Sequence, residues 1–255
     1  MKQKIIAFTV FDKNNEKYAN ILEKSFHHFH PDIPLRMFGD ADVRKANDPE
    51  IFYKQKPYFA DKLFREGYDA VLGLDADMII LGKLDYIFDT KGYDVGTVLN
   101  FNPVDFRTMG PIAVQGIHYA TEYYNAGLVM MRSHAFVKHW LRLCQSKYFT
   151  RFQYREQDLM NIIAHFGNYQ VKCFDDADDF AKYYAWHGLL GSHETTKMQM
   201  VNGDVYLPAS PDGFPSRDII FKVWHPAGGQ TPYDKLNYRT AFNEDVVEYI
   251  NNILK

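Results

Sequence analysis

An apolar stretch that two carboxylates interrupt constrains the fold of this chain more than any other feature. The stretch covers residues 70–81, and Asp75 and Asp77 lie in its middle, one residue apart. Apolar residues on both sides predict a buried strand, typical of a parallel sheet, that ends at this pair. Two like charges at the end of a buried strand are costly unless a cation or hydrogen bonds offset them. The stretch therefore predicts a site for a divalent metal ion.

The same spacing of two aspartates occurs at three places, but only one of them ends an apolar run. The pairs lie at residues 40–42, 75–77 and 176–178. The first pair follows Phe38 and Gly39 in a polar stretch and indicates a solvated loop. The third belongs to the acidic cluster 175–179. We therefore expect metal chemistry at the middle pair alone.

The composition is that of a globular protein with a full hydrophobic core. The chain has 255 residues, of which 46% are hydrophobic and 16% aromatic, and it fits one large domain. Its net charge is −3, and its lysines and arginines are scattered among acids, which argues against a nucleic-acid partner. The first apolar run, residues 5–10, is too short for a signal peptide or a membrane span and predicts a first strand.

The two cysteines indicate the redox state of the compartment in which the protein is found. Cys144 falls on a predicted helix and Cys173 on a predicted strand, and no Cys-x-x-Cys spacing suggests zinc or redox chemistry. We expect buried free thiols in a reducing compartment, which favours the cytoplasm.

Strands and helices alternate along the chain. Strands are predicted at residues 5–10, 35–38, 70–74, 93–99, 125–131, 169–174 and 219–224, and helices at 18–29, 57–66, 136–144, 157–166 and 246–254. This order predicts an α/β fold, a Rossmann-like and mostly parallel sheet with helices on both faces. The irregular regions 101–123 and 185–215 are expected to be long loops that line or cover a site.

Five motifs in a fixed order carry a resemblance to a known family. They are Lys56-Pro57, Asp75-Ala76-Asp77, Tyr124-Asn125-Ala126-Gly127, the segment Glu156–Asn161, and His225-Pro226-Ala227-Gly228. With them the chain resembles the metal-dependent glycosyltransferases of the GT-A fold, in particular the glycogenin-like and bacterial galactosyltransferase-like group, glycosyltransferase family 8. The resemblance implies a single GT-A domain over residues 1–255, in which residues 1–100 bind the nucleotide and residues 101–255 bind the sugar and the acceptor.

The resemblance also implies a reaction. A hexosyltransferase of this group moves a sugar from a nucleoside-diphosphate sugar to a glycan or another hydroxyl acceptor. By the same resemblance the nucleotide is UDP, the anomeric configuration is retained, and the cofactor is Mn²⁺ or Mg²⁺.

The implied metal ligands are Asp75, Asp77 and His225. Asp77 is the firmer ligand, whereas Asp75 and the adjacent Ala76 also belong to the donor site. Chemistry supports this assignment, because hard oxygen ligands suit these ions and a diphosphate needs its charge neutralised as it departs. The glycines after His225, Gly228 among them, let the backbone approach a phosphate closely. Thr231 stands where the family usually has a lysine.

Strand ends and one helix supply further implied donor contacts. The resemblance places the nucleobase at Thr9, Val10 and Asp12, at the carboxyl end of the first strand, where α/β sheets bind ligands. Lys56 or Lys62 gives positive charge to the ribose or phosphate, or else lies on a solvated helix face.

By the same resemblance, two further motifs act on the donor sugar. Asn125 and Gly127 contact the donor sugar, although the same residues could form a strand entry with a small packing site. The implied catalytic residues Glu156, Gln157 and Asp158 contact sugar hydroxyls or stabilise the oxocarbenium-like centre. A helix dipole favours acids at such a position even without catalysis. The family's motif more often begins with Asp-Gln, so Glu156 departs from it.

Two other functions remain open. A phosphatase of the haloacid-dehalogenase type also ends an apolar strand in Asp-x-Asp, here Asp75 and Asp77, and the acids that follow residues 171–174 fit its second motif. In that family, however, the strand usually lies near the N-terminus. The other possibility is a non-catalytic nucleotide-sugar-binding module, since a fold does not fix a function.

Overall fold

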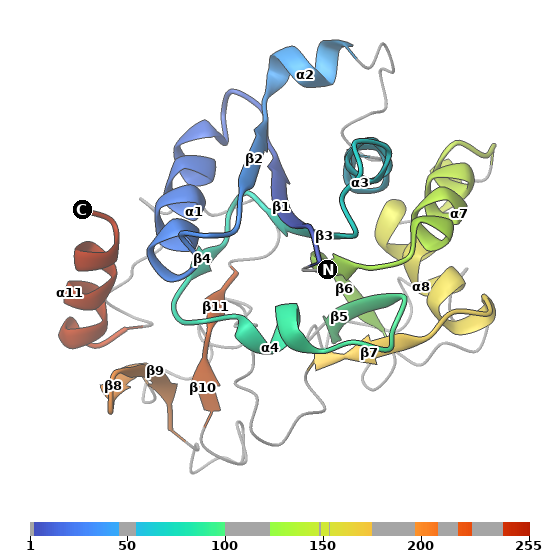
Figure 1. Ribbon diagram of the computed structural model, residues 1–255. Helices are drawn as coiled ribbons and strands as arrows, with labels where there is room; N and C mark the ends of the chain where they lie inside the picture. Colours follow the sequence, from blue (N-terminus) through green and yellow to red (C-terminus); the bar gives the residue numbers. More distant parts are fainter. Residues whose placement is uncertain are drawn as a thin grey trace. The chain divides into compact units, whose positions relative to one another are not determined.

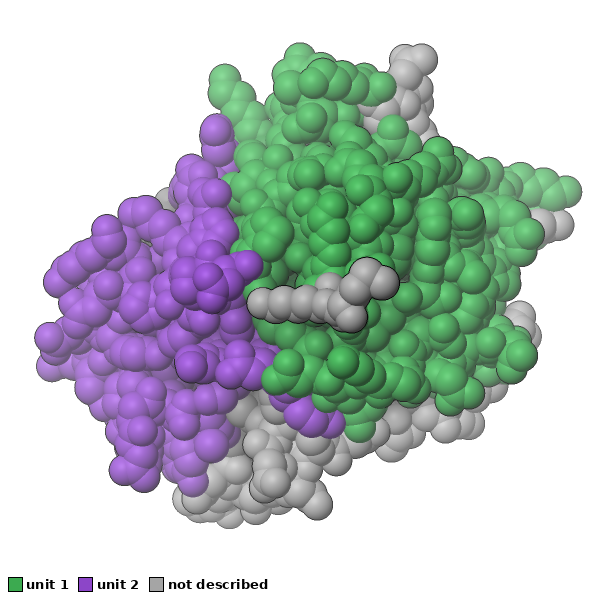
Figure 2. Space-filling model, viewed as in Figure 1, with its two compact units in different colours: residues 1–13, 33–75, 87–174 green, residues 14–32, 76–86, 175–255 purple. Residues whose placement is uncertain are grey.

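A computed structural model describes residues 3–45, 55–99, 123–147, 149–152, 154–174, 197–208, 219–225 and 242–255. The chain divides into two compact units, coloured green and purple in Figure 2. Unit 1 comprises residues 1–13, 33–75 and 87–174, and unit 2 comprises residues 14–32, 76–86 and 175–255.

Unit 1 is built on a six-stranded sheet (Figure 1). Its strands, in spatial order, are β2 (Leu35–Phe38), β1 (Ile5–Val10), β3 (Ala70–Asp75), β6 (Tyr124–Met131), β5 (Val95–Leu99) and β7 (Val171–Cys173). β1 runs parallel to β2 and β3, and β5 runs parallel to β7, whereas β6 is antiparallel to both neighbours. The predicted α/β class and the mostly parallel sheet are confirmed.

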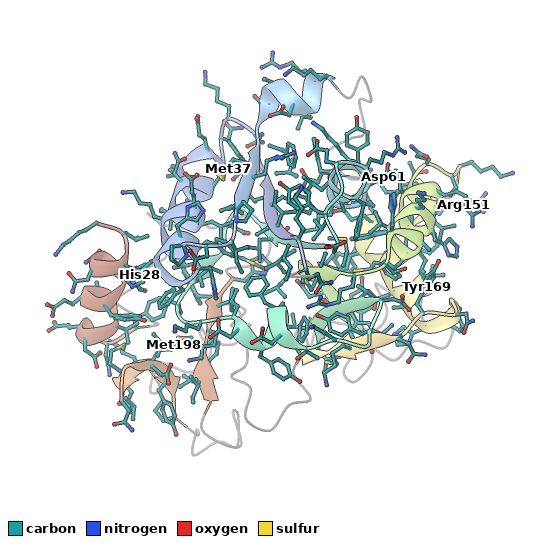
Figure 3. All side chains as sticks on the ribbon, in the orientation of Figure 1. His28, Met37, Asp61, Arg151, Tyr169 and Met198 are labelled. Carbon is teal, nitrogen blue, oxygen red and sulfur yellow. The ribbon has the colours of Figure 1, made fainter. Side chains whose placement is uncertain are left out.

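Three helices of unit 1 share one hydrophobic core with this sheet. They are α3 (Gln55–Arg65), α7 (His134–Cys144) and α8 (Glu156–Phe166), and α7 contacts both of the others. Phe8 of β1, Trp140 of α7 and Ile163 of α8 are each at most 1% exposed in this core. On the α3 side, Asp61 accepts a hydrogen bond from Arg65 at 2.6 Å and lies 2.8 Å from Nε2 of His134 (Figure 3). Both packing and polar contacts therefore hold the helices in place.

Local signals explain where α7 begins and where α8 ends. The Ser133 hydroxyl accepts a hydrogen bond from the Phe136 N–H at 3.3 Å and caps α7, as its position before the helix predicts. Gly167 ends α8, and its N–H donates to the Ile163 carbonyl at 2.8 Å. The Trp140 indole N–H donates to the Glu156 carbonyl at 2.8 Å and so links the two helices.

Unit 2 combines helices with small antiparallel sheets. Its elements include α1 (Glu16–Phe29), β4 (Ile79–Ile80), β8 (Gln199–Val201), β9 (Asp204–Leu207), β10 (Ile219–Phe221), β11 (Val223–Trp224) and α11 (Glu244–Ile253). β4 pairs with β11, while β10, β9 and β8 form a three-stranded sheet. Side chains from α1, α11 and these strands form its core, with Trp224 and Phe242 each 1% exposed. A short helix, α4 (Asp85–Asp89), contributes residues to both units.

Three predictions from the sequence were wrong in detail. The region 185–215 was expected to be a long loop, but its described part contains the antiparallel strands β8 and β9, which Asn202 and Gly203, both at positive φ, connect in a tight turn. The aspartates at residues 40–42 begin a helix, α2 (Asp40–Lys45), because acids in its first turn and bases in its last suit the helix dipole and Val43 is buried. The strand predicted at residues 219–224 is broken at Lys222, whose ammonium forms an ion pair with Asp204. The third aspartate pair, at residues 176–178, lies outside the described residues.

Other predictions are confirmed. Cys144 and Cys173 are buried free thiols. The strand predicted at residues 5–10 is β1 without change.

In the part of the chain that the structure describes, no helix has the length and apolar character needed to cross a bilayer.

One buried histidine of unit 2 leads to a prediction about pH. Nε2 of His30 accepts a hydrogen bond from the Leu84 N–H at 2.9 Å, so this ring nitrogen carries no proton. Burial lowers the pKa of His30, with Asp85 opposing and Lys83 adding to the shift. The unfolded chain therefore takes up this proton at a higher pH than the native protein, and native stability falls as the pH drops below about 6.5. Below the lowered native pKa the loss stops growing.

The variant His30→Gln tests this pH dependence, because a glutamine oxygen can still accept from Leu84 but does not titrate. We expect its free energy of unfolding, measured with urea at pH 7.5 and pH 5.5, to fall less between the two conditions than that of the wild type. His28→Gln, at an exposed position on α1, is the matched control and should keep the wild-type difference (Figure 3). Equal pH dependence in all three proteins would contradict the assignment.

Candidate functional site

The candidate site of unit 1 begins where strands β1 and β3 end. The two strands are parallel, and Val10 is the register partner of Asp75. Antiparallel β6 starts at Tyr124 and pairs with β3 up to Leu128 and Leu74. Side chains that follow β1 and β3, and those that open β6, therefore belong to one edge of the sheet. This is the edge at which α/β sheets bind ligands.

A buried lysine neutralises the carboxylate at the end of β3. The Lys56 ammonium forms an ion pair with Oδ1 of Asp75, and the lysine is only 4% exposed. Burying an ammonium is costly unless a charge partner is present, and Asp75 is that partner. Lys62, by contrast, is exposed, and its ammonium lies 5.4 Å from the centre of the Phe38 ring. Of the two lysines, Lys56 is the one that contacts the aspartate pair.

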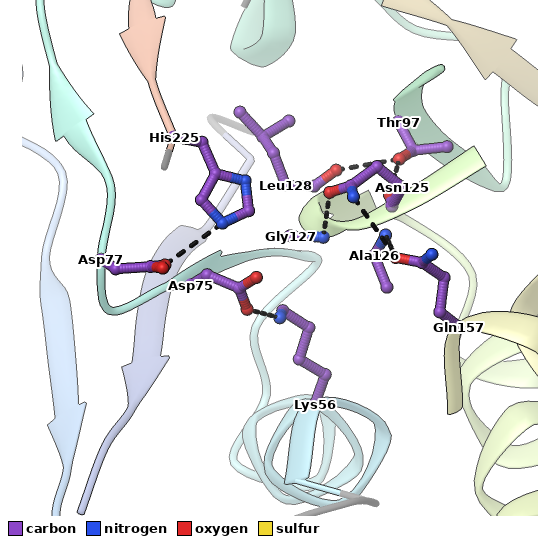
Figure 4. Close-up of polar contacts among 10 residues, drawn as sticks. All are labelled: Lys56, Asp75, Asp77, Thr97, Asn125, Ala126, Gly127, Leu128, Gln157 and His225. Atoms are coloured by element: carbon purple, nitrogen blue, oxygen red, sulfur yellow. Dashed lines mark hydrogen bonds and ion pairs between the residues drawn. The ribbon is translucent and has the colours of Figure 1, made fainter. Parts of the chain in front are cut away.

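Asp77 and His225 come together in unit 2 (Figure 4). Antiparallel pairing of β4 with β11 places Trp224 opposite Ile79, so the residue after β11 meets the segment before β4. Nε2 of His225 consequently lies 3.2 Å from Oδ1 of Asp77. The histidine is 2% exposed, whereas the aspartate is partly exposed. The local folding of the chain thus builds an imidazole–carboxylate pair.

Asp75 precedes Asp77 by two residues. Among the described residues, Asp75, Asp77 and His225 are a group of three side chains that could hold a metal ion, each offering one ligand atom. Two carboxylate oxygens and one imidazole nitrogen are a donor set that suits Mn²⁺, and a more oxygen-rich shell would suit Mg²⁺. The residues present therefore fit the divalent cofactor that the sequence implies.

Strand β6 carries a bulge where it begins (Figure 4). Thr97 of β5 pairs with Val129, but the next residue, Val98, pairs with Asn125, so the register leaves residues 126–128 without partners in β5. The Thr97 hydroxyl lies 2.6 Å from the Asn125 carbonyl and 3.0 Å from the Leu128 carbonyl, across the bulge. Bulges beside active sites commonly re-aim side chains.

The beginning of α8 contacts this bulge through Gln157. Oε1 of Gln157 accepts hydrogen bonds from the Ala126 N–H at 2.9 Å and from Nδ2 of Asn125 at 3.3 Å. Oδ1 of Asn125 in turn accepts from the Gly127 N–H at 2.6 Å. The motif at residues 124–127 and the motif at residues 156–161 are therefore one hydrogen-bonded structure.

The two acids that flank Gln157 differ in environment. Asp158 is 3% exposed and accepts from the Tyr123 hydroxyl at 2.6 Å and from the Tyr154 N–H at 2.8 Å. Burial raises its pKa, and these two hydrogen bonds oppose the shift. Burial also raises the pKa of Glu156 to about 8, opposed chiefly by the Lys56 charge and reinforced by that of Asp75. Without a bound ligand, Glu156 is therefore mainly protonated at neutral pH.

The predicted nucleobase residues lie at the end of β1. Thr9 and Val10 are buried, and the Thr9 hydroxyl has no hydrogen-bond partner among the described residues. Asp12, two residues beyond the strand, is partly exposed. Gly228, to which the sequence assigned a close approach to phosphate, and Thr231, which stands where the family usually has a lysine, lie outside the described residues.

The sequence reasoning missed three residues of the network. Tyr123 and Thr97 carry no motif of their own. Asn161 belongs to the quoted motif but was given no role, although it binds both backbone groups of Tyr124, at 2.7 and 2.9 Å, and so joins α8 to β6. Its position four residues after Gln157, on the same helix face, is the one signal that could have found it.

The likeness of this chain to solved structures identifies its fold as the GT-A fold of glycosyltransferases. A scan against protein-family models and a search of curated proteins each find no match. Among solved structures, the galactosyltransferase LgtC, in complex with donor and acceptor sugar analogs, matches with a TM-score of 0.59 and 18% identity over 97% of this chain and 94% of that one.

Two further solved structures show the same likeness. The bifunctional glycosyltransferase WbbM matches with a TM-score of 0.62 and 17% identity, over 99% of this chain and 50% of its own. The glycosyltransferase GlyE of Streptococcus pneumoniae TIGR4 matches with a TM-score of 0.58 and 14% identity, over 98% of this chain and 63% of its own. The chain thus spans about half to two thirds of the length of these two proteins. The resemblance stated from the motifs is confirmed at the level of the fold.

Proposed function

We propose that this chain is a divalent-metal-dependent glycosyltransferase. It transfers a sugar from a nucleoside-diphosphate sugar, UDP being favoured, to the hydroxyl of a glycan or similar acceptor, with retention of configuration. The observation that carries the proposal is the Asp77–His225 pair, 3.2 Å apart, with Asp75 two residues earlier at the carboxyl end of a buried strand. LgtC and GlyE, which share the fold, are glycosyltransferases by name.

The proposed metal ligands are Asp75, Asp77 and His225. A bound Mn²⁺ or Mg²⁺ would offset the diphosphate charge and stabilise the nucleoside diphosphate as it leaves. Lys56 neutralises Asp75 through its ion pair and contributes a further positive charge near the phosphates. Because Lys56 is buried, its charge is screened less by water and salt than a surface charge would be.

The remaining site residues, apart from the buried Asp158, take the roles that the resemblance implies. In the proposal, residues 1–100 bind the nucleotide, with the base near Thr9, Val10 and Asp12, and residues 101–255 bind sugar and acceptor. Asn125 and Gly127 lie against the donor sugar, next to Gln157. Glu156, mainly protonated without ligand, can donate a hydrogen bond to a sugar oxygen or, once ionised, stabilise developing positive charge.

The fold does not favour the phosphatase alternative. The strand that carries Asp75 is the third along the chain and lies at the centre of the sheet beside an antiparallel strand. A phosphatase mechanism would also give no role to the Asp77–His225 pair or to the hydrogen bonds of Gln157 with Asn125 and Ala126. The two buried free thiols fit the reducing compartment, the cytoplasm, that we propose for the protein.

Thermal stabilisation by nucleotides tests the proposal. The protein is heated with UDP, GDP, CMP or dTDP, each with Mn²⁺ or with EDTA. We expect UDP with Mn²⁺ to raise the Tm, because a ligand at 100 times its Kd stabilises the native state by about 2.7 kcal/mol. EDTA should remove most of the shift. A protein that responds to none of the nucleotides in the presence of Mn²⁺ is not the proposed enzyme.

A further inference from the structure

We infer that Tyr123 and Asp158 are positioning residues that fix the orientation of the Gln157 side chain and, through it, the Asn125–Gly127 turn. The inference rests on the proposed function, in which this turn lies against the donor sugar. All of the residues involved belong to unit 1. The argument follows one chain of hydrogen bonds from the Asp158 carboxylate to the Gly127 N–H.

The direction of each hydrogen bond in this chain is determined. A tyrosine hydroxyl has one proton, and Tyr123 gives it to Oδ1 of Asp158 at 2.6 Å. The same oxygen has no second proton and can otherwise act only as an acceptor. Nε2 of Gln157 donates to it at 3.2 Å. With its nitrogen held there, Gln157 must turn its oxygen the other way. A rotated amide would place its NH₂ group against the Ala126 N–H, donor against donor.

The amide oxygen of Gln157 then fixes the turn. It accepts from the Ala126 N–H and from Nδ2 of Asn125, which leaves Oδ1 of Asn125 to accept from Gly127. Residues 126–128 have no register partners in β5. Side-chain hydrogen bonds from Gln157, Asn125 and Thr97 therefore contribute much of what shapes this bulge.

Asp158 and Tyr123 cannot themselves contact a sugar in this arrangement. Both oxygens of the Asp158 carboxylate accept hydrogen bonds, from Tyr123 and from Tyr154, and the residue is 3% exposed. Tyr123 is fully buried. Each can influence the reaction only through Gln157 and the turn, which is why their role is positioning rather than catalysis.

The variant Tyr123→Phe tests the inference, because it removes the hydroxyl and keeps the ring. We expect kcat for release of UDP from a UDP-sugar to fall about 10- to 100-fold, since misplacing groups around the reacting centre by about 1 Å can cost 100-fold. The affinity for UDP with Mn²⁺, measured by calorimetry, should stay within about twofold, because UDP lacks the sugar that the turn contacts. The substrate used is whichever of UDP-glucose, UDP-galactose and UDP-N-acetylglucosamine the wild type hydrolyses fastest.

Tyr93→Phe is the matched control. Tyr93 is also buried in unit 1, and its hydroxyl donates to the Ile87 carbonyl at 3.1 Å, away from the candidate site. Its loss should lower the Tm about as much as Tyr123→Phe while leaving kcat unchanged. If Tyr123→Phe does not fold, Asp158→Asn replaces it, because an NH₂ group then takes the place of one of the two oxygens that accept from Tyr123 and Tyr154.

The possible outcomes separate the two proposals. The positioning role would be overturned if the folded Tyr123→Phe variant kept the wild-type kcat. It would also be overturned if kcat and the affinity for UDP fell by the same factor. Either result would leave the proposed function intact. A wild-type protein that neither binds UDP with Mn²⁺ nor hydrolyses any of the three UDP-sugars would overturn the proposed function, and the inference with it.

Discussion

Replacing Asp77 by asparagine is expected to weaken Mn²⁺-dependent UDP binding by about 100-fold or more. Losing a group that merely orients a metal ligand costs about 10- to 100-fold in affinity, and we expect the loss of a direct carboxylate ligand to cost at least as much. The amide oxygen can still accept from Nε2 of His225, so the unliganded protein should keep nearly its wild-type Tm. Calorimetric titration of UDP with Mn²⁺ measures the affinity, and heating without ligand measures the Tm.

The chain offers its own matched control for this experiment. Asp42 belongs to a second Asp-x-Asp pair, and its partner is a surface lysine, Lys45, 3.9 Å away. Asp42→Asn makes the same chemical change on α2, and it should leave UDP affinity unchanged and lower the Tm only slightly, since the ion pair with Lys45 and the helix dipole each contribute little at such a position. Full metal-dependent binding by Asp77→Asn would refute the assignment of Asp77 as a ligand. Equal losses in both variants would point to an unspecific effect of charge.

The sequence predicted most of the sheet because its strands are buried on both faces. Continuous apolar runs at residues 5–10 and 70–74 have the length of a strand rather than of a helix, and β1 and β3 follow them closely. Shorter elements escaped prediction. β4 has two residues and α4 has five, too few for a period to be seen, and tertiary packing determines them. The prediction of a solvated loop at residues 40–42 was wrong for a similar reason. The burial of Val43 is a tertiary contact, and it favours a helix there that the local sequence does not reveal.

The sequence predicts the candidate site only where a single residue stands out from the residues around it. Asp75 and Asp77 interrupt an apolar run, and His225 follows one, so each is visible as a polar residue in an apolar context. The link between Asp77 and His225 is not visible, since it arises from pairing between β4 and β11, separated by more than a hundred residues of sequence. The hydrogen-bond chain through Tyr123 was likewise hidden, because a tyrosine in an aromatic-rich chain looks like any core residue.

Replacing Trp140 by alanine is expected to have the largest effect on stability in unit 1. Trp140 is fully buried on the face of α7 that carries Phe136 and Val137, and truncating a buried tryptophan costs about 3–5 kcal/mol. The Glu156 carbonyl also loses the indole N–H that donates to it at 2.8 Å. Since domains are stable by about 5–15 kcal/mol in total, the variant should retain only part of its stability. Urea unfolding followed by circular dichroism measures the loss.

A graded pair of variants separates packing from the hydrogen bond at this position. Trp140→Phe keeps an aromatic ring but removes the N–H, and we expect it to lose about 0.5–1.5 kcal/mol for this hydrogen bond, because the Glu156 carbonyl keeps its acceptor role within α8. Lys138→Ala, at an exposed position on the same helix, should stay within about 0.5 kcal/mol of wild type. Because the carbonyl belongs to Glu156, the first residue of α8, Trp140→Phe should also lower kcat in the folded protein. If it unfolds as easily as Trp140→Ala yet keeps its kcat, the indole serves packing alone, and the beginning of α8 is held by the Gln157 and Asn161 contacts to β6.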